Sequence, residues 1–202
     1  MVAHFRVAAD DCDGARDEAE DSVRLSRRIA NPSQLAIALT ALGSSLLDSD
    51  SSAALAALDE SIAITDSGAS DVLLATSLAK AAIARAALGQ STESLDLLGR
   101  SIRHSVFCGD VPSIVLTLAH GLTVITDFAR PELLIRWAAT IEQSDYRISD
   151  PQRVMLDRAE SRAAETVDPG RRAEIRATIA TLSFDEAVDR ILRELDAEIE
   201  AG

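Results

Sequence analysis

The sequence predicts an all-α fold, and three observations support this prediction. Hydrophobic residues make up 47% of the 202 residues but aromatic residues only 3%, because the apolar positions hold mainly Ala, Leu, Ile and Val. Gly and Pro are sparse, at 9 and 5 residues, whereas a β-sandwich needs more turn residues and more aromatic side chains. The third observation is an internal repeat, whose period is typical of paired helices.

The repeat consists of columns of similar residues spaced by 39 or 40 positions. One pair of columns holds a small hydroxyl residue followed by a branched apolar residue: Ser22, Ser61, Ser101 and Thr140, then Val23, Ile62, Ile102 and Ile141. An offset pair keeps the same spacing: Ala36, Ala75 and Val115, then Leu39, Leu78 and Leu118. Two kinds of helix therefore alternate. We call those with the offset columns first-type helices and those with the hydroxyl column second-type helices.

Apolar residues within each half-period recur at i, i+3, i+4 and i+7, as at Leu55, Leu58 and Ile62, which is the spacing of one helix face. This pattern predicts helices and no strand. The predicted helices cover residues 2–9, 12–29, 33–47, 52–66, 71–88, 92–108, 112–128, 131–143, 151–166, 171–181 and 184–200.

Local signals at the helix ends agree with these ranges. Ser52, Asp71 and Thr92 are predicted to cap helix N-termini with a side-chain oxygen. Gly89 is predicted to end a helix with a positive φ. Prolines are expected in first turns, where a missing N–H costs nothing; they are Pro32, Pro112 and Pro131.

The repeat also predicts the domain organisation. Residues 1–146 are expected to form the repeat array, and residues 147–202, which depart from the period, a C-terminal helical cap. Too few residues precede the helix at 12–29 for a full first helix, so the first repeat is expected to be truncated. An exposed N-terminal hairpin would leave apolar surface uncovered, so a homodimer through that end is one expectation.

Charge narrows the classes of partner. The formal net charge is −13, so direct binding of nucleic acid or of an anionic membrane surface is not expected. No apolar run reaches the ~18 residues of a membrane helix. Two distant cysteines, Cys12 and Cys108, and the lack of a signal peptide favour a cytoplasmic protein. Arg24, Arg27 and Arg28 are close in sequence and are interpreted as a solvated helix face.

Two segments resemble known families. Residues 78–102, LAKAAIARAALGQSTESLDLLGRSI, resemble a tetratricopeptide repeat, although its aromatic positions are aliphatic here. Residues 24–68 and 178–192 are similar to the C-terminal repeat region of large bacterial ATPase regulators of the LuxR, AfsR and adenylate-cyclase-like types. The chain has no GxxxxGK[ST] phosphate loop, so nucleotide hydrolysis is not carried over.

The resemblance implies antiparallel helical hairpins stacked as a right-handed tetratricopeptide-like solenoid. It also implies a scaffold or regulatory interaction module, part of a bacterial transcriptional or signalling regulator. In the tetratricopeptide family the first-type helices line a concave groove. The candidate groove residues here are Thr76, Lys80, Arg85, His120 and Thr123. Lys80 and His120 occupy one column, so they are expected to form a cationic spot for a carboxylate or phosphate; solvent-facing polar residues are the alternative.

Other candidate sites are weaker. His104 and Cys108 share a helix face, and with His120 they offer three zinc ligands, but no spacing fixes a fourth. Trp137 is expected in the core, with a cation–π or ligand role as the alternative. The acidic pairs are interpreted as solvated faces or first-turn charges, because no catalytic motif includes them.

The function expected from the sequence is therefore a non-enzymatic scaffold that binds a protein segment, a peptide or a small effector, with no cofactor and no metal. The alternative is a helical sensor that binds a small ligand or a metal. A closed apolar pocket would favour the sensor, and an open groove would favour the scaffold.

Overall fold

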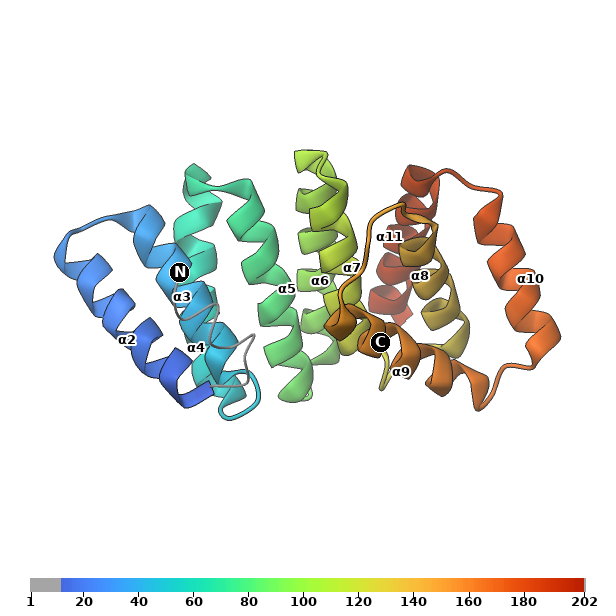
Figure 1. Ribbon diagram of the computed structural model, residues 1–202, viewed down its shortest axis with the longest axis horizontal. Helices are drawn as coiled ribbons and strands as arrows, with labels where there is room; N and C mark the ends of the chain where they lie inside the picture. The colour runs from blue at the N-terminus through green and yellow to red at the C-terminus, as the bar shows by residue number, and fades with distance from the viewer. Residues whose placement is uncertain (1–11, 202) are drawn as a thin grey trace. The chain divides into compact units, whose positions relative to one another are not determined.

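The computed structural model describes residues 12–201, and this part of the chain is helical with no strand (Figure 1). The helices are α2 (Cys12–Arg28), α3 (Pro32–Leu46), α4 (Ser51–Ile64), the short wide turn η1 (Thr65–Ala69), α5 (Asp71–Ala87), α6 (Ser91–Cys108), α7 (Val111–Ile125), α8 (Pro131–Gln143), α9 (Asp150–Ala164), α10 (Pro169–Ala180) and α11 (Phe184–Ala201). The all-α prediction is confirmed for these residues.

The predicted helix ranges agree with the observed bounds to within three residues at every end. The helix predicted at 2–9 lies outside the described residues. Pro32, Pro112 and Pro131 occupy first turns as predicted. Gly89 follows α5 with a φ of 75°, which confirms the predicted left-handed helix end.

The predicted helix caps are wrong by one or two residues. The side chain of Asp50 accepts a hydrogen bond from the backbone N–H of Ala53, and so caps α4 in place of Ser52. Ser70 accepts from the N–H of Leu73, and so caps α5 in place of Asp71. Thr92 is the second residue of α6, which begins at Ser91. Each predicted cap lies inside the first turn, because the chain enters the helix slightly earlier than the apolar pattern indicates.

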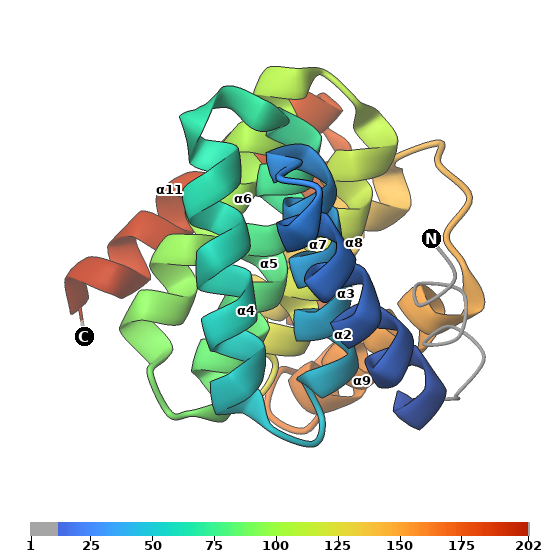
Figure 2. The same cartoon turned by 90° about the vertical axis from the view of Figure 1, so that its left-hand side faces the viewer.

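The chain forms two compact units, one up to His104 and one from Ser105 onward. We call them unit 1 and unit 2 and describe each by itself. In unit 1, α3 packs against both α2 and α4, and α4 packs against α5. Figure 2 views this unit from the side of α2, with α2 in front of α3 and α4 to the left. The predicted division at residue 146 stays a prediction.

Two of the sequence columns correspond to a repeated contact in unit 1. Ser61 on α4 donates its hydroxyl hydrogen bond to the carbonyl oxygen of Ala36 on α3, at 3.0 Å. One repeat later, Ser101 on α6 donates to the carbonyl oxygen of Ala75 on α5, at 2.6 Å. Both serines are fully buried. The small hydroxyl lets each second-type helix approach the first-type helix before it, and its buried polar atom is satisfied.

Further buried hydroxyls accompany this contact. Thr40, Ser61 and Ser77 lie within hydrogen-bond distance of one another, with oxygen–oxygen distances of 2.8 to 3.2 Å. Ser105 and Thr117 form a similar pair in unit 2, at 2.9 Å. These helix interfaces are therefore partly polar, which is consistent with the low aromatic content.

In unit 2, α8 is the central helix, since α7, α9, α10 and α11 all contact it. Trp137 on α8 is fully buried, which confirms its predicted place in the core. Two more fully buried α8 residues, Ala138 and Ile141, lie near it in sequence. A helix surrounded on all sides is expected to be apolar around most of its circumference, and the α8 sequence meets that requirement.

Among the described residues, no helix is both long enough and apolar enough to cross a lipid bilayer.

Candidate functional site

A groove of about 740 Å³ lies on unit 1, where it is lined by residues of α2, α3 and α4. We call it the arginine-rimmed groove. Its lining residues are Arg16, Glu20, Val23, Arg24, Arg27 and Arg28 from α2, Leu39, Leu42 and Leu46 from α3, and Ala53, Ala56, Ala57 and Glu60 from α4. Two second-type helices form its walls, so it differs from the groove predicted on the first-type helices.

The floor of the groove is apolar because one face of α3 carries leucines. Leu39, Leu42 and Leu46 recur at helical spacing, which places them on the same side of α3. Leu39 belongs to the same buried cluster as Val23 of α2 and Ala57 of α4, and Leu42 packs against this cluster. The floor is therefore the outer surface of the unit 1 core.

The rim of the groove is charged and predominantly basic. Four arginines from α2 stand against two glutamates, Glu20 and Glu60, among the lining residues. Arg27 Nη2 approaches both carboxylate oxygens of Glu60, at 2.6 and 2.9 Å, and so joins α2 to α4. Arg16 pairs with Glu20 at 2.9 Å, and Arg24 pairs with Asp21 at 2.6 Å. The rim thus carries a positive excess in a chain whose net charge is −13.

These rim ion pairs are weak restraints on the arginines. In the three pairs, 41% to 69% of each side chain is exposed to solvent. An exposed ion pair contributes ~0–1 kcal/mol, because water screens the charges and the long side chains lose entropy. The guanidinium groups can therefore turn towards an anionic ligand at small cost.

The predicted groove residues of unit 1 lie on α5 and do not all share one face. Thr76 donates its hydroxyl to the carbonyl of Val72 in its own helix. Arg85 lies near Asp59 of α4, at 3.6 Å, and donates to the side chain of Gln90. Lys80 is partly buried, and desolvation by burial lowers the pKa of its ammonium group. Lys80 and Thr76 are one turn apart, whereas Arg85 is turned towards α4.

The remaining predicted groove residues, His120 and Thr123, lie on α7 in unit 2 and are both partly buried. The hydroxyl oxygen of Thr123 is buried without a hydrogen-bond partner among the described residues. Because Lys80 belongs to unit 1 and His120 to unit 2, their predicted joint cationic spot stays a prediction.

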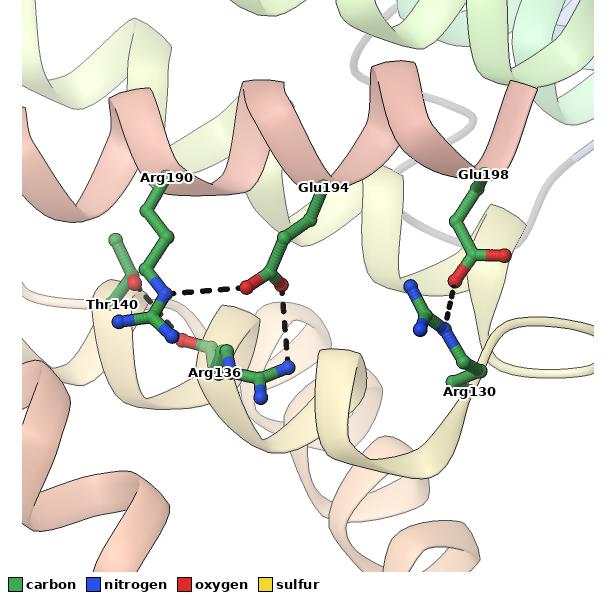
Figure 3. Close-up of polar contacts among 6 residues, drawn as sticks. All are labelled: Arg130, Arg136, Thr140, Arg190, Glu194 and Glu198. Carbon is green, nitrogen blue, oxygen red and sulfur yellow. Dashed lines mark hydrogen bonds and ion pairs between the residues drawn. The ribbon is translucent and has the colours of Figure 1, made fainter. Parts of the chain in front are cut away.

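Unit 2 contains an ion-pair network between α8 and α11 (Figure 3). The carboxylate of Glu194 on α11 accepts from Arg136 of α8 at 3.4 Å and from Arg190 of α11 at 3.2 Å. Towards the C-terminal end of α11, Glu198 accepts from Arg130 at 2.5 Å. Arg136 therefore links α8 to α11 through a largely buried ion pair, and Arg130, the residue before α8, adds a more exposed pair.

A second bridge in unit 2 is centred on Arg176 of α10. Its guanidinium contacts Glu142 of α8, at 2.6 Å, and Glu160 of α9. It therefore ties together three of the helices of unit 2.

The part of the chain that the structure describes has no cluster of three or more His, Cys, Asp or Glu residues that could hold a metal. Among its carboxylates, Glu186 has a lowered pKa, because the backbone N–H and then the hydroxyl of Ser183 donate to it. This shift arises from capping of α11.

The sequence interpretation missed the groove, although it included three of its arginines. Arg24, Arg27 and Arg28 were expected to be a solvated face. The sequence did contain a signal for this rim. One face of α2 carries charged residues at helical spacing around the apolar repeat position Val23; they are Arg16, Glu20 and Arg27. The separation of α2 from α4, which opens the groove, has no counterpart in the sequence.

No protein-family model, no curated protein and no solved structure matches this chain.

Proposed function

We propose that the protein is a non-enzymatic binding scaffold whose binding site is the arginine-rimmed groove. The observation that carries this proposal is the combination of an apolar floor with an exposed, predominantly basic rim in one groove of about 740 Å³. Binding sites commonly combine an apolar surface with a few charged groups that orient the ligand. The groove has this composition, and its acids are paired with arginines of the same rim.

In this proposal the helix pairs stack as a right-handed, tetratricopeptide-like solenoid, and the scaffold is a regulatory interaction module of the cytoplasm. The repeated Ser–carbonyl contact at Ala36 and Ala75 supports stacking of equivalent helix pairs. The ligand is a protein segment or a small effector, and its binding is passed on to a partner or to a further domain.

A small-ligand sensor is the second candidate. The volume of the groove lies within the ~300–1,000 Å³ of small-molecule sites, which favours this candidate. Against it, the rim is exposed on both walls, whereas a sensor pocket usually encloses most of its ligand.

The test blocks the groove without disturbing the core. Ala56 lines the groove and is exposed on α4, so Ala56→Trp fills the groove with a side chain that needs no space in the core. Ligands that bind the wild-type protein are selected from a random peptide library and from a small-molecule fragment library. Their affinities for the wild type and for Ala56→Trp are then measured by calorimetry. We expect affinity to fall at least about tenfold in Ala56→Trp, a loss of ~1.4 kcal/mol.

The matched control is Ala173→Trp, the same exchange at an exposed position of α10 in unit 2. It should leave affinity unchanged. Selected ligands that bind Ala56→Trp as well as they bind the wild type would place the binding site elsewhere and contradict the proposal.

A further inference from the structure

The groove has features that narrow the class of ligand. We infer that its occupant is an acidic amphipathic helix supplied by a partner protein. This inference rests on the proposed function, since it names the ligand of the same groove.

The first feature is the sign of the charge on the rim. The whole chain carries −13, so long-range attraction favours cationic ligands. The rim reverses this locally: four arginines line the groove, against two glutamates of the lining and Asp21, which pairs with Arg24. Arginine binds carboxylates with paired donors, so the groove selects a segment with carboxylates. Nucleic acid also carries negative charge, but it would leave the leucine floor unused and meet repulsion from the rest of the chain.

The second feature is the length of the rim. Arg16 and Arg28 are separated by twelve positions along α2, and a helix rises about 1.5 Å per residue, so the rim is roughly 18 Å long. A compact anion cannot reach both ends. A partner helix of about twelve residues has the same length. Its carboxylates, spaced by four residues, would match the one-turn spacing of Arg24 and Arg28.

The third feature is the shape of the walls and floor. The α4 wall consists of the small residues Ala53, Ala56 and Ala57, with Glu60 at its end. Small side chains let a second helix approach closely. Of the floor residues, Leu39 and Leu46 are buried and Leu42 is partly exposed, so the apolar face of that helix would pack mainly on Leu42 and on Ala53 and Ala56 of α4. An extended peptide that pairs as a strand needs a strand edge, and one that binds as a polyproline helix needs an aromatic-lined groove. The described residues contain no strand, and no aromatic residue lines this groove.

The same geometry sets the affinity that we expect between the groove and the partner helix. Leu39 and Leu46 are already buried in the free protein, so the ligand adds little new apolar burial. Ordering the peptide and the arginines costs several kcal/mol in addition. We therefore expect a dissociation constant of about 10–100 μM, which weakens further as salt screens the rim.

The experiment uses three probe peptides of equal length, titrated by calorimetry against the full chain. The acidic peptide is a helix-forming segment with Leu at i, i+3 and i+7 and Glu on both flanks. The basic peptide replaces each Glu by Lys, and the polar peptide replaces each Leu by Ser. We expect the acidic peptide to bind at least about tenfold more tightly than the other two.

A second experiment reverses the charge of the rim and asks whether the preference for the acidic peptide changes with it. Arg24→Glu/Arg28→Glu changes two exposed rim residues, so it should weaken the acidic peptide at least about tenfold and strengthen the basic peptide. The matched control, Arg147→Glu/Arg193→Glu, makes the same charge change at exposed residues outside the groove. It should leave the preference of the groove for the acidic peptide intact.

Each other outcome overturns the inference. If the basic peptide binds the wild type as well as the acidic one, the rim does not select charge. If the polar peptide binds equally, the floor is not used. If the wild type sediments as a dimer and Ala56→Trp as a monomer, the occupant is a second copy of this chain.

Failure here is distinguishable from failure of the proposed function. If the acidic peptide does not bind but Ala56→Trp still weakens the binding of the selected library ligands, the groove binds another class of ligand. Only this inference then fails. If no ligand is lost in Ala56→Trp, the groove is not the binding site and both proposals fail.

Discussion

Ala30 is the one non-glycine residue with a positive φ, 51°, among the described residues. It follows α2 at the turn before α3, in a left-handed conformation that glycine adopts with less strain. Gly68, Gly89 and Gly109 occupy similar turns with positive φ values. Ala30 is therefore a strained variant of a turn that elsewhere uses glycine.

We predict that Ala30→Gly raises the free energy of unfolding by about 1 kcal/mol, because it relieves this strain. The reverse exchange, Gly89→Ala, should lower it by a similar amount, since nothing lies within 4 Å of the added Cβ and only the φ of 75° opposes it. Denaturant unfolding followed by circular dichroism measures both. Opposite signs support the backbone explanation, and equal signs contradict it.

The lowered pKa of Lys80 is expected to make the free energy of unfolding depend on pH in the alkaline range. Its pKa is lowered from 10.5 by desolvation, so the folded protein binds this proton less tightly than the unfolded chain does. The free energy of unfolding should then rise as the pH increases from the folded pKa towards 10.5. Below the folded pKa, the charged amine is a constant cost to the folded state.

We predict that Lys80→Met increases the free energy of unfolding at pH 7 by on the order of 1 kcal/mol, since it removes a partly buried charge. The same substitution should also reduce the rise in the free energy of unfolding between the folded pKa of Lys80 and pH 10.5. Urea unfolding of both proteins at a series of pH values from neutral to 10.5 provides the comparison. An identical pH dependence in the two proteins would show that Lys80 keeps its ordinary pKa.

At the scale of elements, the buried serines test whether the sequence repeat is a structural repeat. Ser101→Ala removes the hydrogen bond to Ala75 from a fully buried site. We predict a loss of ~1 kcal/mol in the free energy of unfolding. Ser22, in the same sequence column, is exposed and bonds within its own helix, so Ser22→Ala should be within ~0.5 kcal/mol of the wild type. Equal losses would contradict this distinction.

The contact between α3 and α4 depends on a glycine. A Cβ at Gly43 would lie 2.5 Å from Leu58 Cγ and 3.1 Å from the carbonyl oxygen of Ala54. We predict that Gly43→Ala destabilises the protein by about 1–3 kcal/mol through this overlap.

The control for this prediction is Gly99→Ala on α6. There the nearest atom to the added Cβ is the flexible end of Arg103, at 2.9 Å. Helix propensity then favours alanine by up to ~1 kcal/mol, so this exchange should be neutral or stabilising. Thermal unfolding of both variants separates steric overlap from propensity. A stabilising Gly43→Ala would mean that Leu58 moves aside readily.

The elements were predictable because their signals are local. Helical spacing and first-turn prolines depend on residues a few positions apart, and the observed bounds agree with them. The hydroxyl column of the repeat contains both serines that bond to the preceding helix, Ser61 and Ser101. The column did not predict this contact, since the hydroxyls of Ser22 and Thr140 bond within their own helices. The caps were missed because Asp50 and Ser70 precede the apolar pattern.

The groove could not be predicted, because it depends on how far apart two non-adjacent helices lie. Periodicity places Val23 and Leu39 in a core, and both are buried there, but it does not determine the space left between α2 and α4. The packing of α2 on α3 determines that the rim arginines border the groove. Only their presence on α2 could be read from the sequence.

At the scale of the whole molecule, the excess of acids should control solubility. The isoelectric point calculated from the sequence is about 4.6. We predict a solubility minimum near this pH, about tenfold below the solubility at neutral pH, because mutual repulsion vanishes as the net charge approaches zero. Turbidity across a pH series at low salt measures it. A minimum well above this pH would mean that many carboxylates hold their protons in the folded protein.

The placement of the aromatic residues makes the two units optically distinct. The chain has one Trp and one Tyr, and both Trp137 and Tyr146 belong to unit 2. Trp137 is fully buried in α8, so its fluorescence will shift when α8 loses its neighbours. Far-ultraviolet circular dichroism instead follows the helices of both units. Comparing the two signals in one titration would measure whether unit 1 melts with unit 2 or separately, without any added label.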